Sequence, residues 1–372
     1  MQILLTNFHH RDGGGHTTYL LTLARGLRAR GHAVHLAVPE GSRAHREAAA
    51  IAGVRVHAQR YPKGVAAMWR LWPALRRLRT VIAEHGIELV HANGSADHRL
   101  VALAARGLTP RPALVWTKHN SKPATSLGHR LRTRRTDLVI AVSEHTRAEL
   151  AATPYRSCRI EAIANGIDTA HFAPWPPAQA AKARRQWGFD DEALVLGSIA
   201  GTAAYKGWLD LVEALALLDP HERAAVRVLL AGRPPEPAAL RRVARLGLSG
   251  QVRFAGLLDD VRPLVAAFDA GFVLSWGVET ISFACREMMA MGKPVLVSDY
   301  AGLPENVRAG VDGWIVSARD RAAIAAAVRG LLAQRARLPA MGAAARERAV
   351  AEFGVERFVA DTEAAYVRAL GR

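Results

Sequence analysis

Cysteine and long apolar runs are both scarce in this sequence. The 372 residues include two cysteines, Cys158 and Cys285, too few for a disulfide framework and not spaced like zinc ligands. No segment approaches the ~20 apolar residues that a membrane-spanning helix needs, and residues 1–8 lack the basic start of a secretory signal. These absences argue against a disulfide scaffold and an integral membrane protein, and they favour a cytoplasmic location.

Acidic residues are fewer than basic ones, and the difference is larger in the first half of the chain than in the second. The chain carries 50 Lys and Arg against 33 Asp and Glu. Residues 1–178 have a net charge of +14, whereas residues 179–372 have a net charge of +3. A general preference for arginine would affect both halves alike, so the asymmetry predicts an anionic partner for the first half: an acidic acceptor, a membrane surface or nucleic acid.

Short apolar runs alternate with amphipathic stretches, which predicts an α/β fold with mainly parallel sheets. The first run is followed by a glycine loop at 11–16 and a helix at 17–30, but the dinucleotide fingerprint G-x-G-x-x-G is missing, which disfavours a nicotinamide-dependent oxidoreductase. After a proline-rich linker at 174–177 the pattern restarts. Strands are expected at 1–7, 31–38, 54–58, 89–92, 113–117, 138–142, 193–199, 226–231, 252–255, 271–274, 295–298 and 314–316.

This restart predicts two Rossmann-like domains. We expect one such domain at 1–172 and a second at 173–350. The chain reads as helical from about residue 339 onward, with a break at Phe353-Gly354. The final segment, 351–372, is expected to pack back on the N-terminal domain.

Residues 275–305 hold the most informative stretch of the second half. A strand is followed by a polar turn with Glu279, and then by a short helix that Thr280 or Ser282 caps and that contains Glu287. The free N–H groups and the dipole at such a helix start attract a phosphate. The alternative is an ordinary βαβ unit with solvated glutamates.

Several motifs in this order resemble glycosyltransferase family 4, whose members have the GT-B fold. Glu279 and Glu287 are followed by Ala290-Met-Gly-Lys-Pro-Val and Gly302-Leu-Pro-Glu, as in that family. Each motif is weak alone, and their joint order and spacing carry the resemblance from about residue 3 to 366. The other matches are Gly14-Gly15, Leu23-Ala24, Gly31-His32, His119, Ala141-Val-Ser-Glu144, Asn165-Gly-Ile-Asp168, Phe172, Lys206-Gly207 and Phe254-Ala-Gly256.

The resemblance implies a retaining glycosyltransferase whose two Rossmann-like domains face each other across a cleft, with the domain at 1–172 binding the acceptor and the domain at 173–350 binding the nucleotide sugar. It implies that Lys206 faces the donor's diphosphate, that Glu287 binds ribose hydroxyls and that Glu279 lies against the donor sugar. His119 is expected beside that sugar, so His119, Glu279 and Lys206 are the catalytic candidates. The expected donor contacts are Gly14, Gly15, Gly201, Lys206, Glu279, Thr280, Ile281, Ser282, Phe283 and Glu287.

The expected donor is a nucleotide-diphosphate sugar, with a UDP-sugar as first choice. In the family the leaving diphosphate itself helps to deprotonate the acceptor, so no separate base is required. The family lacks an Asp-x-Asp metal site, and the sequence contains no such motif. We therefore expect a metal-independent enzyme without a cofactor.

The sequence departs from the family pattern at three places. Gly201 stands where the family has an arginine that pairs with the lysine, so the diphosphate loses one bidentate partner. Thr280-Ile281-Ser282 replaces a glycine–aromatic–glycine triplet. His16-Thr17 replaces a triplet that often carries an acid.

The acceptor is expected to be an anionic envelope glycan or glycolipid such as lipopolysaccharide. His91 and His98 are expected in a loop that faces the cleft. Residues 63–79 combine two tryptophans with five basic residues, which is typical of contact with an anionic membrane, although a buried helix with an arginine face explains the pattern almost as well. The expected acceptor contacts are His16, His91, Asn93 and His98.

Three alternatives remain open from the residues alone. The first is a glycosyltransferase that acts on a small soluble acceptor. The second is a nucleic-acid-binding protein, which the charge suggests but for which no RNA- or DNA-binding module is present. The third is a non-catalytic sugar-binding protein, which the pairing of Lys206 with two glutamates disfavours.

Overall fold

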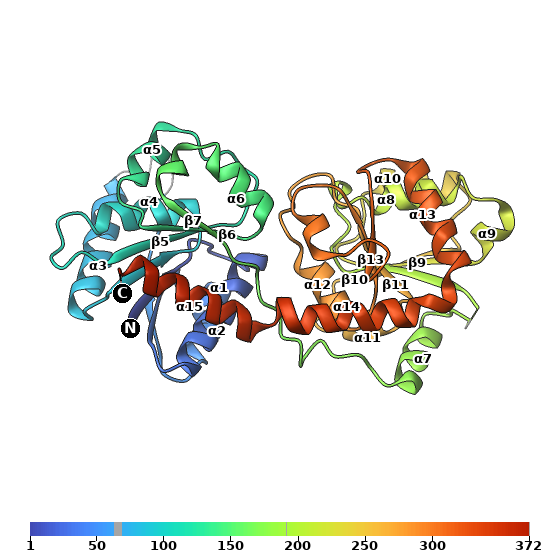
Figure 1. Cartoon of the computed structure of the whole chain (residues 1–372), viewed down its shortest axis with the longest axis horizontal. Coiled ribbons are helices and arrows are strands. Elements are labelled where there is room, and N and C mark those ends of the chain that lie inside the picture. The colour runs from blue at the N-terminus through green and yellow to red at the C-terminus, as the bar shows by residue number, and fades with distance from the viewer. Residues whose placement is uncertain (63–68, 191, 372) are drawn as a thin grey trace. The chain divides into compact units, whose positions relative to one another are not determined.

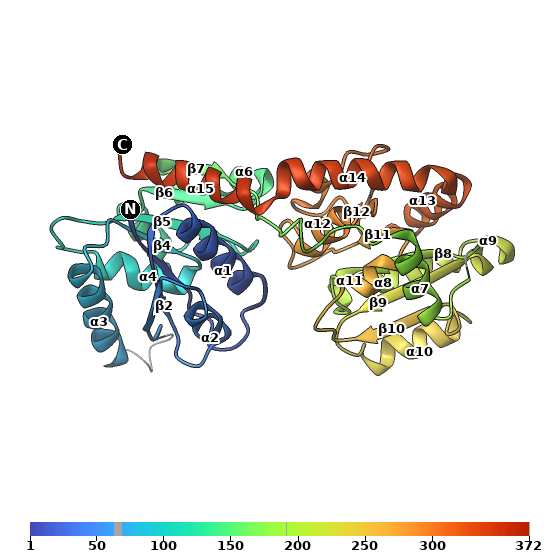
Figure 2. The same ribbon diagram turned by 90° about the horizontal axis from the view of Figure 1, so that it is seen from below.

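The computed structural model describes residues 1–62, 69–190 and 192–371, which divide into two compact units. Unit 1 comprises Met1–Gly166 and Val355–Arg372, and unit 2 comprises Ile167–Gly354. Figures 1 and 2 show that each unit is a sheet covered by helices. Residues 167–172 and 351–354, which the sequence analysis assigned to the first domain and to the final helical segment, belong to unit 2.

Unit 1 is built on a seven-stranded parallel sheet in the order β3-β2-β1-β4-β5-β6-β7. Its central strands are rich in Val, Ile and Leu and are buried, as expected where helices cover both faces of a sheet. The strands are β1 Gln2–Thr6, β2 Ala33–Val38, β3 Val54–Ala58, β4 Leu89–Ala92, β5 Ala113–Lys118, β6 Leu138–Ala141 and β7 Arg159–Ala162.

Helices cover both faces of this sheet. Figure 2 shows α1 and α2 on one side of the strands and α3 on the other. The helices of unit 1 are α1 Gly14–Ala29, α2 Arg43–Ala49, α3 Leu71–Glu84, α4 Ser95–Ala104, α5 Leu127–Thr133, α6 Glu144–Ala151 and α15 Val355–Ala369.

The glycine segment after β1 starts a helix rather than forming a loop. Helix α1 begins at Gly14, three residues before the expected start, so Gly14 and Gly15 lie in its first turn. Gly13 caps this turn with a φ of 73°, a left-handed conformation that favours glycine. Both Gly14 and Gly15 are exposed at this helix start.

Strand β7 was not predicted from the sequence. Its residues, Arg159-Ile-Glu-Ala162, alternate polar and apolar side chains because β7 is the edge strand and is only partly buried. The continuous apolar runs that reveal the central strands are therefore absent from it.

Helix α15 closes unit 1 by packing against α1. A side chain at Gly26 of α1 would meet Val359 at 2.2 Å, so glycine allows the two helices to approach closely. The Tyr19 and Phe358 rings of the same two helices pack edge to face with centroids 4.9 Å apart. The last segment of the chain thereby completes the core of the unit that contains the first segment.

Unit 2 is built on a six-stranded parallel sheet in the order β10-β9-β8-β11-β12-β13. Each of these strands lies within two residues of its predicted position. The strands are β8 Leu194–Ser198, β9 Val226–Ala231, β10 Val252–Gly256, β11 Ala270–Val273, β12 Val295–Ser298 and β13 Gly313–Val316. The helices are α7 Pro177–Gln186, α8 Trp208–Leu215, α9 Pro220–Ala224, α10 Pro237–Arg245, α11 Arg262–Ala266, α12 Phe283–Ala290, α13 Arg321–Ala333 and α14 Leu338–Phe353.

Candidate functional site

The strand order of unit 2 reverses at β8. From β8 the chain moves to β9 and β10 on one side, and it then returns to β11, β12 and β13 on the other. Loops that leave neighbouring strands in opposite directions open a crevice at the carboxyl ends of the strands, where α/β proteins bind ligands. The loops after β8 (199–207) and after β11 (274–282) meet this condition.

These two loops are joined by a half-buried ion pair. The Lys206 ammonium lies 2.7 Å from a Glu279 carboxylate oxygen, and both side chains are largely shielded from solvent. The Trp276 N–H donates to the Tyr205 carbonyl at 2.9 Å, which connects the loops a second time. The structure thus brings together two predicted catalytic residues that lie 73 positions apart.

Gly207 allows this close contact. Its φ is 72°, and a side chain there would lie 1.9 Å from the Leu274 carbonyl oxygen. A residue other than glycine would push the two loops apart. Gly207 also caps the start of α8, so the same residue positions Lys206 and begins the next helix.

Helix α12 begins at the carboxyl edge of β11. Ser282 is its N-cap, and its hydroxyl accepts the Cys285 N–H at 3.3 Å. Thr280, the other expected cap, instead donates its N–H to Glu279. Ile281 is buried and its carbonyl accepts from Asn306, so this residue of the predicted donor set supports the loop from inside. Phe283 packs partly against the core.

Glu287 lies in α12 and is half-buried. Burial raises the pKa of its carboxyl to about 7. Within the described parts of the chain no side chain or backbone group donates a hydrogen bond to it. A carboxylate in such a setting is a ready acceptor for the hydroxyl groups of a ligand.

The backbone conformation of the loop after β8 favours glycine at position 201. Its φ is 93°, a conformation that an arginine adopts only with strain. A side chain at Gly232 would meet the Thr202 nitrogen at 2.8 Å, so the loop after β9 packs directly on this backbone. The Thr202 hydroxyl donates to the Arg233 carbonyl, which places the exposed Arg233 beside the loop.

In unit 1, a cluster of uncharged side chains gathers where β1, β4 and β5 end. The His119 ring nitrogen lies 2.6 Å from the Asn93 side-chain oxygen, and the Asn93 amide donates to the His16 carbonyl at 2.8 Å. The His16 and His119 rings are 4.5 Å apart. Three predicted residues from three elements therefore meet.

Burial keeps this cluster neutral. It lowers the pKa of His16, and it holds the pKa of His119 well below its usual range, with His16 and His91 adding repulsion. Tyr19, which sequence reasoning missed, presents its ring edge to His119 with centroids 4.6 Å apart. The only sequence signal for Tyr19 was its place on the inner face of the first helix.

The expectation that His91 and His98 lie in an open loop is wrong. His91 belongs to β4 and contacts the Thr117 hydroxyl at 2.6 Å, and His98 belongs to α4 and stacks on the Trp116 ring at 4.8 Å. Their exposed fractions are 1% and 0%. Burial lowers the pKa of His91 to about 3 and that of His98 well below its usual range, so both are neutral core residues.

A hollow of about 960 Å³ lies beside the loops that follow β2 and β3. Its lining includes three arginines, Arg60, Arg70 and Arg77, and one acid, Glu40. Trp69 also lines it and is 72% exposed. The hollow was not predicted, because it forms only where the ends of two strands meet the start of α3.

The segment predicted to contact a membrane is described in part. Residues 63–68 lie outside the described residues, whereas 69–79 include the start of α3. Trp69 and Trp72 are 72% and 68% exposed, whereas one face of α3 is buried through Ala74, Leu78, Val81 and Ile82. Along the described chain, every helix is too short or too polar to cross a membrane.

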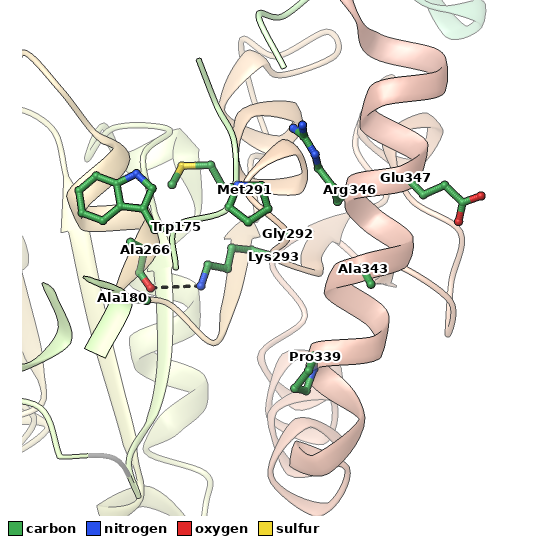
Figure 3. A pocket seen from close by; sticks show the side chains of 11 residues that line it. Trp175, Ala180, Ala266, Met291, Gly292, Lys293, Pro339, Ala343, Arg346 and Glu347 are labelled. Atoms are coloured by element: carbon green, nitrogen blue, oxygen red, sulfur yellow. Dashed lines mark hydrogen bonds between the residues drawn. The ribbon is translucent and has the colours of Figure 1, made fainter. Parts of the chain in front are cut away.

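A second hollow, of about 500 Å³, belongs to unit 2 and lies away from the predicted donor residues. Figure 3 shows Lys293, Met291 and Trp175 around it. Lys293 donates to the Ala266 and Phe268 carbonyls at 3.2 and 2.6 Å, and burial lowers its pKa to about 8. These residues precede β11 and β12, so this hollow is at the amino edge of the sheet, opposite the Lys206–Glu279 pair.

Two Rossmann-like units, each with a parallel sheet covered by helices, are the architecture of the GT-B fold. The structure of HepE from Anabaena in complex with UDP superimposes with a TM-score of 0.84 and 22% identity, covering 99% of this chain and all of that one. Residues 13–171 match the model of Glycosyltransferase Family 4, and residues 191–334 match that of Glycosyl transferases group 1.

Proteins with similar sequences show to which family the chain belongs. The chain is 30% identical over 372 residues, 94% of each protein, to the GDP-mannose-dependent alpha-(1-6)-phosphatidylinositol monomannoside mannosyltransferase of Mycobacterium tuberculosis (strain H37Rv). It is 29% identical over 232 residues to the lipopolysaccharide core biosynthesis mannosyltransferase LpsB of Rhizobium meliloti, covering 60% of this chain and 63% of LpsB. The chain belongs to glycosyltransferase family 4 and is a transferase.

Proposed function

We propose that the protein is a retaining glycosyltransferase that binds a nucleotide-diphosphate sugar on unit 2 and an anionic glycolipid or envelope glycan on unit 1. The observations that support the donor half are the ion pair Lys206–Glu279 and, in the helix that follows Glu279, the carboxyl of Glu287, which receives no hydrogen bond from the described residues. A cation, a helix start and a free acceptor are the three groups that a diphosphate linked to a ribose requires. Family membership disfavours the oxidoreductase, the nucleic-acid-binding protein and the non-catalytic sugar-binding protein.

Each donor group acts on a different part of the ligand. Lys206 neutralises the diphosphate, and the N–H groups at the start of α12 complement its charge. Glu287 accepts from the ribose diol. Glu279 is released from Lys206 when the phosphate replaces it, and it then accepts from a sugar hydroxyl. The ion pair therefore keeps the two loops together when no donor is bound, and it separates when the donor binds.

The leaving diphosphate makes a separate base unnecessary. As the bond between the sugar carbon and the phosphate oxygen breaks, the acceptor oxygen bonds to the same face of that carbon. The acceptor proton passes to the departing phosphate oxygen. His119, which is neutral, then serves to orient the sugar by hydrogen bonding rather than to take a proton. Neither a metal nor a cofactor takes part in this scheme.

Arg233 is proposed to replace the arginine that Gly201 lacks. The Arg233 carbonyl accepts a hydrogen bond from the Thr202 hydroxyl. The Arg233 side chain therefore extends from the loop after β9, which lies next to the loop that carries Gly201. An arginine of the neighbouring loop supplies the same bidentate fork without the strain that a left-handed position would impose.

Charge and shape support an anionic acceptor on unit 1. The hollow beside β2 and β3 carries three arginines and one glutamate, and the exposed Trp69 and Trp72 lie at its rim and on the adjoining helix. Tryptophans at headgroup depth with cations around them bind anionic lipid surfaces. The names of the relatives, which include a phosphatidylinositol mannoside and a lipopolysaccharide core, agree with a lipid-linked acceptor.

A donor screen tests the donor half of this proposal. The purified protein is heated with UDP-sugars, GDP-mannose, ADP-sugars or NAD. The sequence analysis favours a UDP-sugar, whereas a relative is named for GDP-mannose. One nucleotide sugar should raise the melting temperature by several degrees at saturating concentration, because a ligand of the native state stabilises by mass action. Stabilisation by NAD alone, or by none of these ligands, contradicts the proposal.

A further inference from the structure

Three histidines of unit 1 meet at a place that the transferase site does not use. His35 comes from β2, His57 from β3, and His85 from the residue that ends α3. One ring nitrogen of each lies within 4.8 Å of the other two. The His35 Nδ1 and His57 Nε2 atoms are 3.0 Å apart, and the His85 ring lies 4.7 and 5.1 Å from the two others.

The register of the sheet creates this cluster. His35 pairs with Arg55, and Ala37 pairs with His57, so the two histidines are diagonal neighbours on one face of adjacent parallel strands. Helix α3 covers that face and brings His85 down onto them. The three residues are 22 and 28 positions apart, so no local motif reveals them.

We propose that His35, His57 and His85 form a site for a divalent transition-metal ion, with Zn²⁺ held by three imidazoles and a water molecule. Three histidines with an open fourth position are a known zinc ligand set. A tetrahedral ion with Zn–N bonds of ~2.0–2.1 Å places its ligand atoms about 3.3 Å apart. The His35–His57 separation of 3.0 Å is already close to that value, and His85 has to approach by rotation of its side chain.

The protonation state suits a metal. The His35 Nδ1 and His57 Nε2 atoms face each other at 3.0 Å, so they cannot both carry a proton and at least one offers the lone pair that binds metal. Two neutral rings in contact share a single proton between the facing nitrogens. A metal takes the place of that proton, which moves to the other nitrogen of the same ring.

Some charges around the histidine cluster oppose a bound cation, and others favour it. Arg55 lies level with His35 on the sheet and Arg77 projects from α3, and both oppose a cation. Both arginines are exposed, so solvent screens them. The carboxyl end of α3, a helix of 14 residues, lies at His85 and favours positive charge. Neutral packing of three imidazoles is the rival account.

The site is independent of the proposed transfer reaction. It lies under α3, whereas the donor groups Lys206 and Glu287 belong to unit 2. We expect the ion to fasten α3 to strands β2 and β3, next to the arginine-lined hollow. Removal of the ion should therefore lower the thermal stability of the protein while nucleotide-sugar binding is unchanged.

The test uses the full chain without a polyhistidine tag, stripped with a chelator and titrated with Zn²⁺ by calorimetry. One equivalent should bind. Co²⁺ should give the intense visible absorption of a tetrahedral site. The variants His57→Ala and His85→Ala should each weaken Zn²⁺ at least ~10-fold, because even outer partners of metal ligands cost that much. His145→Ala, which removes an exposed histidine on α6, should leave binding unchanged.

Two outcomes overturn the inference. The first is the absence of saturable Zn²⁺ binding by the stripped protein. The second is binding that His57→Ala and His85→Ala leave intact while both variants keep the native circular dichroism spectrum. Both substitutions are at half-buried positions, which is why they are preferred to a change at the buried His35.

Discussion

The two units share one architecture, but they differ in net charge and in whether the groups at their candidate sites are charged. Unit 2 has a nearly balanced charge, and its candidate site contains one half-buried ion pair and one carboxyl without a hydrogen-bond donor. The first half of the chain, which supplies most of unit 1, carries a net charge of +14, yet the groups that meet where β1, β4 and β5 end are neutral histidines. Part of the excess charge lines the hollow beside β2 and β3, and more of it lines a separate hollow of unit 1 whose arginines are Arg99, Arg106, Arg111, Arg132, Arg134 and Arg135.

This difference shows how one fold can recognise two kinds of ligand. A small charged donor needs a few groups at fixed positions, so the loops of unit 2 are bonded to each other. We propose that the large anionic acceptor is instead attracted by the basic surface of unit 1. The predictions below test this division, from the largest expected effect to the smallest.

Lys206→Ala should have the largest effect. It removes the cation on the leaving diphosphate, so we expect kcat/KM to fall by about 10²–10³-fold, which is the effect of losing one group that stabilises developing negative charge. Steady-state kinetics with the donor found by screening measure it. Lys182→Ala, which alters an exposed lysine of the same unit, should keep full activity. Equal activity of both variants would remove Lys206 from the donor site.

Glu287→Gln should weaken donor binding and stabilise the free protein. The folded protein holds the pKa of Glu287 at about 7, above the unfolded value of 4.5. Between these values the folded state binds the extra proton, so stability rises as the pH falls from about 7 to 4.5 and is lost as the pH rises through 7. At pH 8 the glutamine variant should be more stable by up to ~3 kcal/mol.

Urea unfolding at pH 5 and pH 8 measures this effect of Glu287. The variant should lack the pH dependence that the wild type shows, and its donor affinity should no longer increase between pH 6 and 8. Glu347→Gln, at an exposed position of α14, is the control and should change neither quantity. A wild-type stability that does not change across this range would contradict the burial of an ionised Glu287.

Arg233→Ala should reduce donor affinity by about tenfold, which corresponds to ~1.4 kcal/mol. The reason is the loss of the guanidinium that we propose in place of the arginine missing at Gly201. Calorimetry with the nucleoside diphosphate alone measures it. Arg241→Ala on the exposed side of α10 serves as the control. If Arg233→Ala binds the diphosphate as tightly as the wild type, the compensation comes from elsewhere.

Replacing Trp69 and Trp72 by alanine should have the smallest effect and should spare the donor. We expect binding to anionic vesicles to fall about fivefold, or ~1 kcal/mol, while nucleotide-sugar affinity is unchanged. Vesicle sedimentation at moderate salt measures it. Leu257→Ala removes an equally exposed apolar residue from unit 2 and is the control. Wild-type binding that is equal for anionic and neutral vesicles would contradict the anionic acceptor surface.

Much of the fold follows from local patterns. Strands β4, β9 and β12 lie at their predicted residues because buried parallel strands are mostly apolar runs. Edge strand β3 was also predicted, because its valines alternate with polar residues after Gly53. The break between α14 and α15 at Phe353-Gly354 was also predicted, because glycine commonly ends a helix. Edge strand β7 was missed because its four residues, Arg159-Ile-Glu-Ala162, contain a single large apolar side chain and therefore show no clear apolar pattern.

The candidate site divides in a similar way. Glu279, Glu287 and Lys206 were found through a family pattern, and the structure brings Lys206 and Glu279 into contact. His91 and His98 were misplaced because the polar run around them resembles a loop, whereas β4 and α4 leave only two residues between them. A histidine that is satisfied by a buried hydroxyl cannot be told from an exposed one by sequence.

The sequence by itself determined the alternation of strands and helices, the two Rossmann-like units, the charge asymmetry and the positions of the donor motifs. These depend on neighbours within a few residues along the chain. The tertiary structure alone decided which side chains meet: Lys206 with Glu279, Asn93 with His119, and the trio His35, His57 and His85. Such contacts depend on strand order and register, which bring together residues that no local period connects.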